Sequence, residues 1–346
     1  MEDFEYKTTF NVNIYVSGRI RNKERLMVAT LWKNGEVQYV MPKASINSIF
    51  VSENDLYAVG LEYNRNYGKT IAMLWKNGVA QHLTDGDYNA DSEANSIYIA
   101  GNDVYIAGSD VSDGESIPVV WKNGNGQYLR TGNNRYTAHL QSIYVSNNDV
   151  YVAGDVAAFN KAGWLKKIAV LWKNGVAQEL SDGTCNECAK SVFVAGSDVF
   201  VLGDGYNEHD IRVAKVWKNG VAQPLTDGIS RAEATSIFVS EDNVYIAGSE
   251  NNAQKKSVAM LWKNGVAQPL TNGDHYAEAT SVFVLENDVY VAGYECNVQN
   301  NRVAKIWKNG VAQNITAETD DAVVNCIFVK KRNHLHKEFS EDESSN

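Results

Sequence analysis

Short apolar runs alternate with polar turns along most of this chain. In the clearest copy of the pattern the runs cover residues 236–239, 244–248, 258–262 and 266–270. They are rich in Val, Ile, Phe and Tyr and are bounded by Gly, Asn or Asp, which is typical of β-strands. The pattern therefore predicts a repeating unit of four strands.

The third run of each unit ends in the same tetrapeptide, Trp-Lys-Asn-Gly. It occurs seven times, with its Trp at Trp32, Trp75, Trp121, Trp172, Trp217, Trp262 and Trp307. A regular spacing of 43 to 51 residues indicates a stacked or radial repeat. The Asn-Gly pair predicts a type I′ hairpin between the third and fourth strands, because both central positions need positive φ. A Trp that recurs identically predicts packing between repeats rather than an aromatic cage.

The two ends of the chain are out of phase with the repeat. Residues 13–18 align with a second strand, at 149–154, whereas residues 326–329 align with a first strand, at 281–284. Pro224 and Pro269 fall in fourth strands, and Pro is tolerated mainly at a sheet edge. We therefore predict an all-β, seven-bladed β-propeller with four antiparallel strands per blade, whose ring is closed by three N-terminal strands plus one C-terminal strand.

With this pattern the chain resembles the repetitive bacterial-type β-propellers whose blades read "VYVAG … WKNG … L". The resemblance covers roughly residues 12 to 329, and the signatures of WD-repeat and kelch blades are missing. It implies a fold only, because propellers serve as lectins, scaffolds, hydrolases and lyases. The predicted organisation is an N-terminal extension at 1–11, the propeller at 12–329 and a charged tail at 330–346 that we expect to be disordered.

Composition restricts the partners. A net charge of −10 argues against nucleic acid, because Lys and Arg supply most of that affinity. No segment is apolar enough to span a membrane, and the first residues do not resemble a signal peptide, so a cytoplasmic location is the default. Secretion stays an alternative if a leader was removed. We expect a monomer without a cofactor.

The strand order separates two faces of the ring. The first-to-second and third-to-fourth connections form one face, the turn face, and barely change from copy to copy. The second-to-third connections and the links between blades form the other, the loop face, and they vary in length and chemistry. Since function tends to reside on variable loops carried by a rigid scaffold, we predict binding at the loop face. Unconstrained drift of exposed loops is the alternative.

Two groups of loop-face residues are candidates for binding. Around the mouth of the central channel the first strands begin with Ser45, Glu93, His139, Cys188, Glu233, Glu278 and Val323. Of these, Glu93, His139, Glu233 and Glu278 could coordinate a cation or polarise a substrate, or else be solvated. The loops also carry aromatic residues suited to stacking on sugars or to a protein-binding hot spot: Tyr63, Trp164, Tyr206, Tyr276 and Tyr294. Trp164 would otherwise fill a gap beneath its own loop.

Metal motifs are incomplete. Cys185 and Cys188 have the spacing of half a zinc site without a second pair, and residues 85–93 alternate oxygen ligands but lack the Gly and Glu of a calcium loop. We predict no metal site. The predicted function is non-enzymatic binding or scaffolding, with a protein or glycan partner on the loop face. The alternatives are a polysaccharide-active enzyme that uses the mouth carboxylates, and an amplified or engineered repeat without an evolved ligand.

Overall fold

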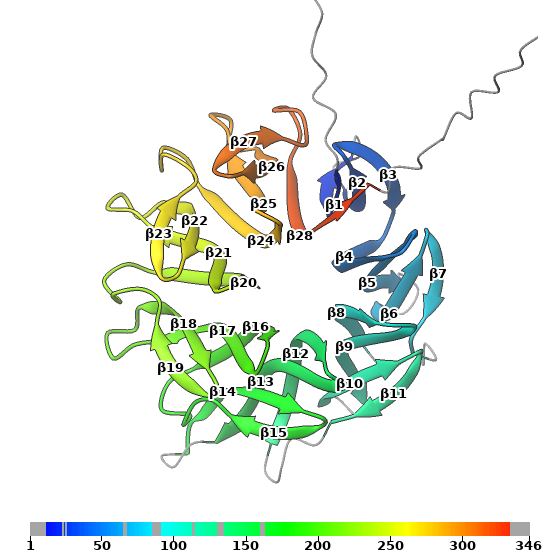
Figure 1. Ribbon diagram of the computed structural model, residues 1–346, viewed down its shortest axis with the longest axis vertical. Helices are drawn as coiled ribbons and strands as arrows, with labels where there is room; N and C mark the ends of the chain where they lie inside the picture. The colour runs from blue at the N-terminus through cyan, green and yellow to red at the C-terminus, as the bar shows by residue number, and fades with distance from the viewer. Residues whose placement is uncertain are drawn as a thin grey trace, which may run out of the picture.

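The computed structural model describes residues 12–22, 24, 26–64, 68–84, 91–112, 115–129, 135–159 and 163–332, with backbone only at 112, 115, 135 and 136. Within these residues lie seven four-stranded antiparallel sheets, which are arranged around a central axis (Figure 1). The predicted seven-bladed propeller is confirmed. The predicted N-terminal extension and residues 333–346 of the predicted tail lie outside the described residues.

Each blade runs from its innermost strand at the axis to its outermost strand at the rim. Blade 1 consists of β28 (Ala322–Lys331), β1 (Val12–Arg21), β2 (Met27–Lys33) and β3 (Glu36–Met41). Blade 2 consists of β4 (Ala44–Ser52), β5 (Asp55–Asn64), β6 (Lys69–Lys76) and β7 (Val79–His82). Blade 3 consists of β8 (Ser92–Ala100), β9 (Asp103–Ser112), β10 (Glu115–Lys122) and β11 (Asn125–Tyr128).

The other four blades follow the same order. Blade 4 consists of β12 (Arg135–Ser146), β13 (Asp149–Phe159), β14 (Leu165–Lys173) and β15 (Val176–Glu179), and blade 5 of β16 (Glu187–Ala195), β17 (Asp198–Tyr206), β18 (Arg212–Lys218) and β19 (Val221–Pro224). Blade 6 consists of β20 (Ala232–Ser240), β21 (Asn243–Asn251), β22 (Ser257–Lys263) and β23 (Val266–Pro269). Blade 7 consists of β24 (Ala277–Leu285), β25 (Asp288–Cys296), β26 (Arg302–Lys308) and β27 (Val311–Asn314).

Blade 1 closes the ring. Its innermost strand β28 comes from the C-terminal part of the chain and pairs antiparallel with β1, from Val12 opposite Lys331 to Ile20 opposite Ala322. In Figure 1 the red strand β28 accordingly lies beside the blue strand β1. The predicted composition of the closing blade is confirmed. Pro224 and Pro269 end the outermost strands β19 and β23, as predicted.

The Trp-Lys-Asn-Gly segment holds the turn face together. Its Asn and Gly have φ of 49–53° and 79–83°, as the predicted hairpin requires. In blade 4, Asn174 Nδ2 donates to Asp149 Oδ1 over 2.7 Å, and Asn174 Oδ1 accepts from Val150 N over 2.9 Å. Lys173 Nζ lies 2.7 Å from Asp149 Oδ2 and 5.2 Å from the centre of the Tyr151 ring. The segment therefore ties the third strand to the start of the second strand.

The Trp side chains pack between blades, as expected. All seven are at most 5% exposed. Trp217 packs against Tyr151 and Leu171 of the preceding blade, and its Nε1 donates to Leu180 O over 2.9 Å. The recurring Gly of the second strand makes room for this contact: a Cβ at Gly203 would lie 1.9 Å from Cys188 O and 3.0 Å from the Trp217 ring.

The innermost strands carry a β-bulge immediately before their recurring Ser or Cys. The Ser hydroxyl accepts from the next blade; for example, Ile143 N donates to Ser96 Oγ over 3.1 Å. Two residues further on, seven aromatic rings form a belt with centroids 4.7–5.3 Å apart: Phe50, Tyr98, Tyr144, Phe193, Phe238, Phe283 and Phe328. Each blade thus contacts both neighbours at the axis. The described residues include no helix with the length and apolar character needed to cross a membrane.

Candidate functional site

An axial cavity of about 650 Å³ lies on the loop face, where the innermost strands begin. Part of its wall consists of the residues in the bulges, namely Asn47, Asn95, Gln141, Lys190, Thr235 and Asn325. A bulge adds one residue to a strand and redirects its side chain. The bulges therefore contribute amides, a hydroxyl and one ammonium group to a wall that also carries the charged side chains of Arg19, Glu93, Asp155, Lys167 and Arg212.

The bulge side chains link successive blades. Asn47 Nδ2 donates to Asn95 Oδ1 over 3.0 Å and to Ala94 O over 3.1 Å. Asn95 Nδ2 in turn donates to Leu140 O and to Glu93 Oε1, both over 3.0 Å. These two amides thus satisfy backbone carbonyls at the bulges, which holds their part of the wall in place.

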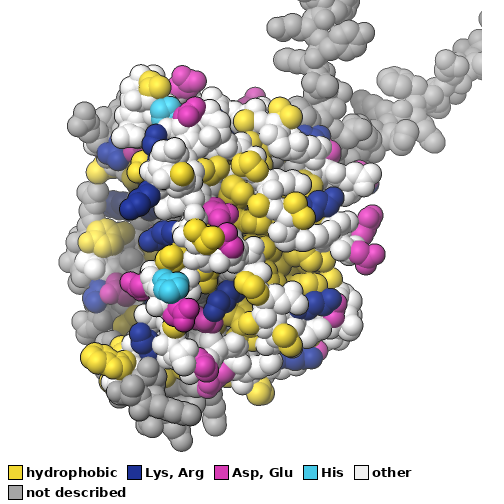
Figure 2. Space-filling model, turned by 90° about the vertical axis from the view of Figure 1, so that its left-hand side faces the viewer, with side chains coloured by type: hydrophobic (Ala, Val, Ile, Leu, Met, Phe, Trp, Pro, Cys, Tyr) yellow, Lys and Arg dark blue, Asp and Glu magenta, His cyan; other side chains and the backbone are white. Residues whose placement is uncertain are grey.

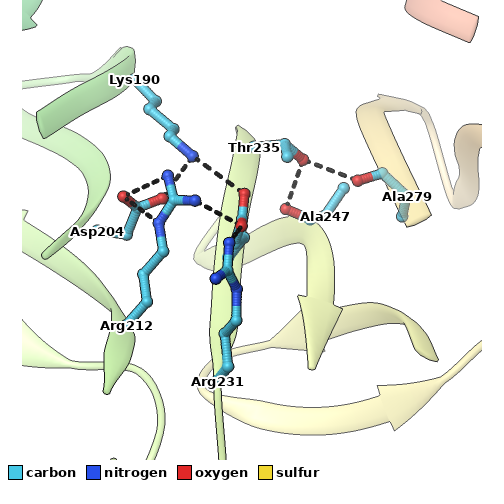
Figure 3. A network of polar contacts seen from close by, with 8 residues as sticks. Lys190, Asp204, Arg212, Arg231, Thr235, Ala247 and Ala279 are labelled. Carbon is cyan, nitrogen blue, oxygen red and sulfur yellow. Dashed lines mark hydrogen bonds and ion pairs between the residues drawn. The ribbon is translucent and has the colours of Figure 1, made fainter. Parts of the chain in front are cut away.

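A charged network extends from this cavity between blades 5 and 6, formed by Lys190, Asp204, Arg212, Arg231 and Glu233 (Figure 3). The Asp204 side chain is 3% exposed, and its Oδ1 lies 3.0 Å from both Nε and Nη2 of Arg212. Its Oδ2 contacts Lys190 Nζ. A carboxylate buried this deeply needs such partners to remain charged. We call these five residues the blade 5–6 network.

Glu233 is the acidic residue through which the network reaches blade 6. It contacts Arg212 Nη1, and its Oε1 lies 2.7 Å from Arg231 Nη2. Burial would raise the pKa of Glu233, but the hydrogen bond from Arg231 and the charges of Arg212 and Lys190 outweigh burial and hold this pKa below its usual range. Glu233 therefore stays ionised near neutral pH and is poorly suited to donate a proton.

A second buried carboxylate, Asp155, lies across the cavity wall beside Cys188. Its Oδ2 is 3.2 Å from Lys167 Nζ. Burial and the negative charge of Asp155 raise the pKa of the Cys188 thiol to about 12. Since the thiolate is the nucleophile and the metal ligand, a thiol held protonated is unreactive at neutral pH. All four cysteines are free thiols.

The structure does not assemble a metal site from the described residues. Among them, no group of three or more His, Cys, Asp or Glu side chains could hold a metal ion. Most of the calcium-like segment, residues 85–90, lies outside the described residues. Cys185 and Cys188 are therefore not brought together with further ligands within the described part of the chain.

The predicted mouth residues differ in their surroundings. Glu93 lines the axial cavity, whereas Glu233 turns into the blade 5–6 network. His139 and Glu278 are partly buried at the equivalent position of their strands and do not line the cavity. Glu278 lies against the Tyr294 hydroxyl, and burial together with the Glu278 charge raises the pKa of Tyr294. Glu93, Glu233 and Glu278 thus have separate partners, and of the four predicted residues only Glu93 lines the cavity.

The predicted aromatic residues fall into two groups. Trp164 is 70% exposed, Tyr276 50% and Tyr63 42%, so these side chains offer surface to a partner. Tyr206 and Tyr294 are partly buried at the ends of β17 and β25. The exposure of Trp164 favours the binding interpretation over the gap-filling alternative.

The loop face is more regular in blades 5, 6 and 7 than the sequence indicates. Asn207 Oδ1 accepts from His209 N and Ile211 N, both over 3.0 Å, and its Nδ2 donates to Gly228 O over 3.1 Å. Asn252 and Asn297 make the same set of bonds in blades 6 and 7. In these blades the backbone of the second-to-third loop is fixed, and what varies is the side chains it displays.

Sequence reasoning missed the bulge residues and the buried carboxylates. The position before the recurring Ser or Cys is polar in every copy (Asn, Asn, Gln, Lys, Thr, Thr, Asn), which is unusual for a strand at the centre of a fold. That regularity was a usable signal. The pairing of Asp204 with Lys190 and Arg212 had no such signal, because these residues lie on three strands.

No protein-family model matches the chain, and no curated protein matches its sequence. Solved structures do match. The β-propeller domain of the Trilobed protease from Pyrococcus furiosus, described as having an open velcro topology, is 11% identical with a TM-score of 0.56, covering 89% of this chain and 95% of that one. The Pyrococcus horikoshii acylaminoacyl peptidase is 12% identical, also with a TM-score of 0.56.

The second match covers 90% of this chain, which spans about half (52%) of that peptidase. At such low identity the likeness shows the propeller fold alone. In this chain β28 and β1 are hydrogen-bonded along their length and close the ring.

Proposed function

We propose that this protein is a non-enzymatic binding or scaffold propeller that recognises a protein partner through the loop face of blades 4 to 7. The observation that carries the proposal is the combination of fixed loop backbones with exposed apolar side chains. Ile229 is 78% exposed and Val298 80%, and both lie on loops anchored by the recurring Asn bonds. A pre-organised surface loses little conformational entropy on binding.

Exposed aliphatic side chains favour a protein over a glycan. Ile and Val offer dispersion contacts but no planar face for a sugar ring, whereas a protein partner buries them readily. Trp164 and Tyr276 would serve either class, since both residue types are enriched in hot spots and also stack on sugars. A glycan partner therefore stays the second candidate, supported by these two residues.

The polysaccharide-active alternative has less support. Glycoside hydrolysis needs two carboxyl groups on opposite sides of one bond, one of them able to donate a proton. Glu233 is held ionised by Arg231, Arg212 and Lys190. Glu93 accepts from Asn95 and Glu278 lies against Tyr294, each on a different blade. The charged groups are thus paired with protein partners rather than directed at a shared point.

The test compares the wild-type protein with a triple variant, Trp164→Ala/Ile229→Ala/Tyr276→Ala, in affinity enrichment from native extract and on a glycan array. The control is Val176→Ala, which removes an equally exposed apolar side chain from the rim. We expect a protein that binds wild type and control directly after purification, with binding at least about tenfold weaker for the triple variant.

Binding on the glycan array that the triple variant loses would replace the protein partner with a sugar. Binding unaffected by the triple variant would place the site elsewhere and refute the proposal. If neither assay detects binding, a repeat without an evolved ligand becomes the better account.

A further inference from the structure

A second cavity, of about 580 Å³, lies on the turn face between blades 5 and 6, on the other side of the ring from the axial cavity. Its floor is apolar and includes Phe200 and Val216 of blade 5 and Val239, Val244 and Ile246 of blade 6. Figure 2 looks at this edge of the ring, where hydrophobic side chains gather among acidic and basic ones. We call this cavity the blade 5–6 groove.

Blade 5 departs from the repeat at two positions of this floor. Where Phe200 stands, the other six blades have Tyr, and four of the Tyr hydroxyls donate to an Asp two residues earlier, as Tyr151 does to Asp149 over 3.4 Å. Where Val216 stands, five blades have the larger Leu or Ile. Both positions face the following blade, so the two smaller side chains widen this groove.

The rim of the groove carries carboxylates. Glu241 and Asp242 form the turn between β20 and β21, and neither side chain makes a hydrogen bond or ion pair with another described residue. The matching turn of blade 7 shows what such a position binds: Glu286, with φ of 55° against 53° for Glu241, contacts the Lys331 ammonium group. The third rim carboxylate, Asp198, is already paired with Lys218 over 2.7 Å.

We propose that the blade 5–6 groove binds an extended segment of a partner protein, which places an apolar side chain on the Phe200–Val216 floor and an adjacent Lys or Arg against Glu241 and Asp242. The volume falls within the range of pre-formed ligand sites, and a few polar groups at the edge of an apolar floor are typical of them. Because this groove is on the turn face, it acts independently of the loop-face site.

The probe is an array of acetylated hexapeptides, Gly-Gly-X-Z-Gly-Gly, in which X and Z each run over all amino acids. The labelled full-length protein is expected to favour pairs that join Leu, Ile or Phe to Lys or Arg. The affinity of the best pair is then measured by titration calorimetry with the free peptide.

Two variants test the two parts of the site. Phe200→Tyr/Val216→Leu fills the floor with the residues that other blades use, so the fold should be kept while affinity falls at least about tenfold. Glu241→Lys/Asp242→Lys reverses the rim charge and should move the preference to apolar–acidic pairs. Tyr245→Phe, which removes the hydroxyl at the same strand position in blade 6, should change neither the affinity nor the preference for apolar–basic pairs.

Absence of enrichment for apolar–basic pairs in the wild-type protein would overturn the proposal. It would be overturned equally if the enriched peptides bound the filled variant unchanged. Since Glu241 and Asp242 are exposed, the charge-reversal variant keeps the test decisive even if the filled variant does not fold.

Discussion

Asp321 adds a charged side-chain contact to the non-covalent closure of the ring at the loop face. Its Oδ1 accepts from Arg302 Nε over 2.7 Å, and its Oδ2 lies 2.8 Å from Arg21 Nη2. Arg302 belongs to blade 7 and Arg21 to the N-terminal strand of blade 1, so one side chain joins both sides of the seam. We predict that Asp321→Asn weakens the fold specifically by loosening this closure.

The magnitude follows from the exposure of the partners. Asp321 is 16% exposed, but Arg302 is 34% and Arg21 44% exposed, so solvent screens both pairs. A well-placed, partly buried charged hydrogen bond contributes about 1.5 kcal/mol, and an exposed pair about 0.5 kcal/mol. We therefore expect Asp321→Asn to cost about 2 kcal/mol, equivalent to a fall in Tm of about 3 °C for a domain of this size.

The assay is thermal unfolding followed by circular dichroism between pH 2 and pH 7. The hydrogen bond from Arg302 holds the pKa of Asp321 below its usual range. A lowered folded-state pKa stabilises the protein above the unfolded value, about 3.9, and this contribution is lost as pH falls through the folded pKa. The difference between wild type and Asp321→Asn should therefore be largest near neutral pH and vanish at the acid end.

Asp91 supplies a matched control, because it occupies the same position before β8 and lies 3.0 Å from Lys69 Nζ, away from the seam. Asp91→Asn should lower the free energy of unfolding less than Asp321→Asn does, since the chain itself connects blades 2 and 3. An equal or larger cost for Asp91→Asn, or a difference for Asp321→Asn that persists at pH 2, would refute the reasoning.

Three further predictions concern the site and its scaffold. Burial and the negative charge of Asp155 raise the pKa of the Cys188 thiol to about 12. Mass spectrometry should therefore show that Cys188 resists alkylation by iodoacetamide at pH 8 in the native protein and reacts after denaturation. Rapid labelling of the native protein would contradict this. Arg212→Leu leaves the buried Asp204 with Lys190 as its one charged partner, so it should lower the free energy of unfolding by about 3 kcal/mol. A loss under about 1 kcal/mol in chemical denaturation would show that the fold does not need the blade 5–6 network. Gly248→Ala should lower the free energy of unfolding by about 3 kcal/mol, because its Cβ would lie 2.1 Å from Glu233 O. Gly265 lies in open space at φ +79°, so Gly265→Ala should lower it by about 1 kcal/mol. Similar losses for the two variants would contradict the steric account.

The repeat made the architecture predictable because every blade needs the same contacts. A Trp that must fill the space between two blades, and an Asn-Gly pair that must adopt positive φ, recur wherever those requirements recur. The incomplete units at the two ends indicated the closing blade for the same reason. Local patterns of this kind carry the information for strands, turns and their order.

The candidate site was predicted less completely because it depends on side-chain direction. The sequence placed Glu93, Glu233, His139 and Glu278 together at the mouth, since they share a position in the repeat. Of these four only Glu93 lines the cavity, and Glu233 turns toward Arg212 and Arg231. The bulge immediately downstream adds side chains that the sequence pattern did not indicate: Asn47, Asn95, Gln141, Lys190, Thr235 and Asn325. A β-bulge shifts the register by one residue and so redirects the side chains that follow, and the alternation of residues along a strand does not predict where a bulge occurs.

By itself, then, the sequence determined the number of blades, the strands of the closing blade and the division into an invariant and a variable face, because these follow from periodicity along the chain. Only the tertiary structure decided which charges are paired, which loops share one backbone and where the blade 5–6 groove opens. Those features arise between residues on different strands and blades, such as Asp204 with Lys190 and Arg212, or Phe200 with Ile246. Their free energies depend on distance and burial, which the order of residues does not specify.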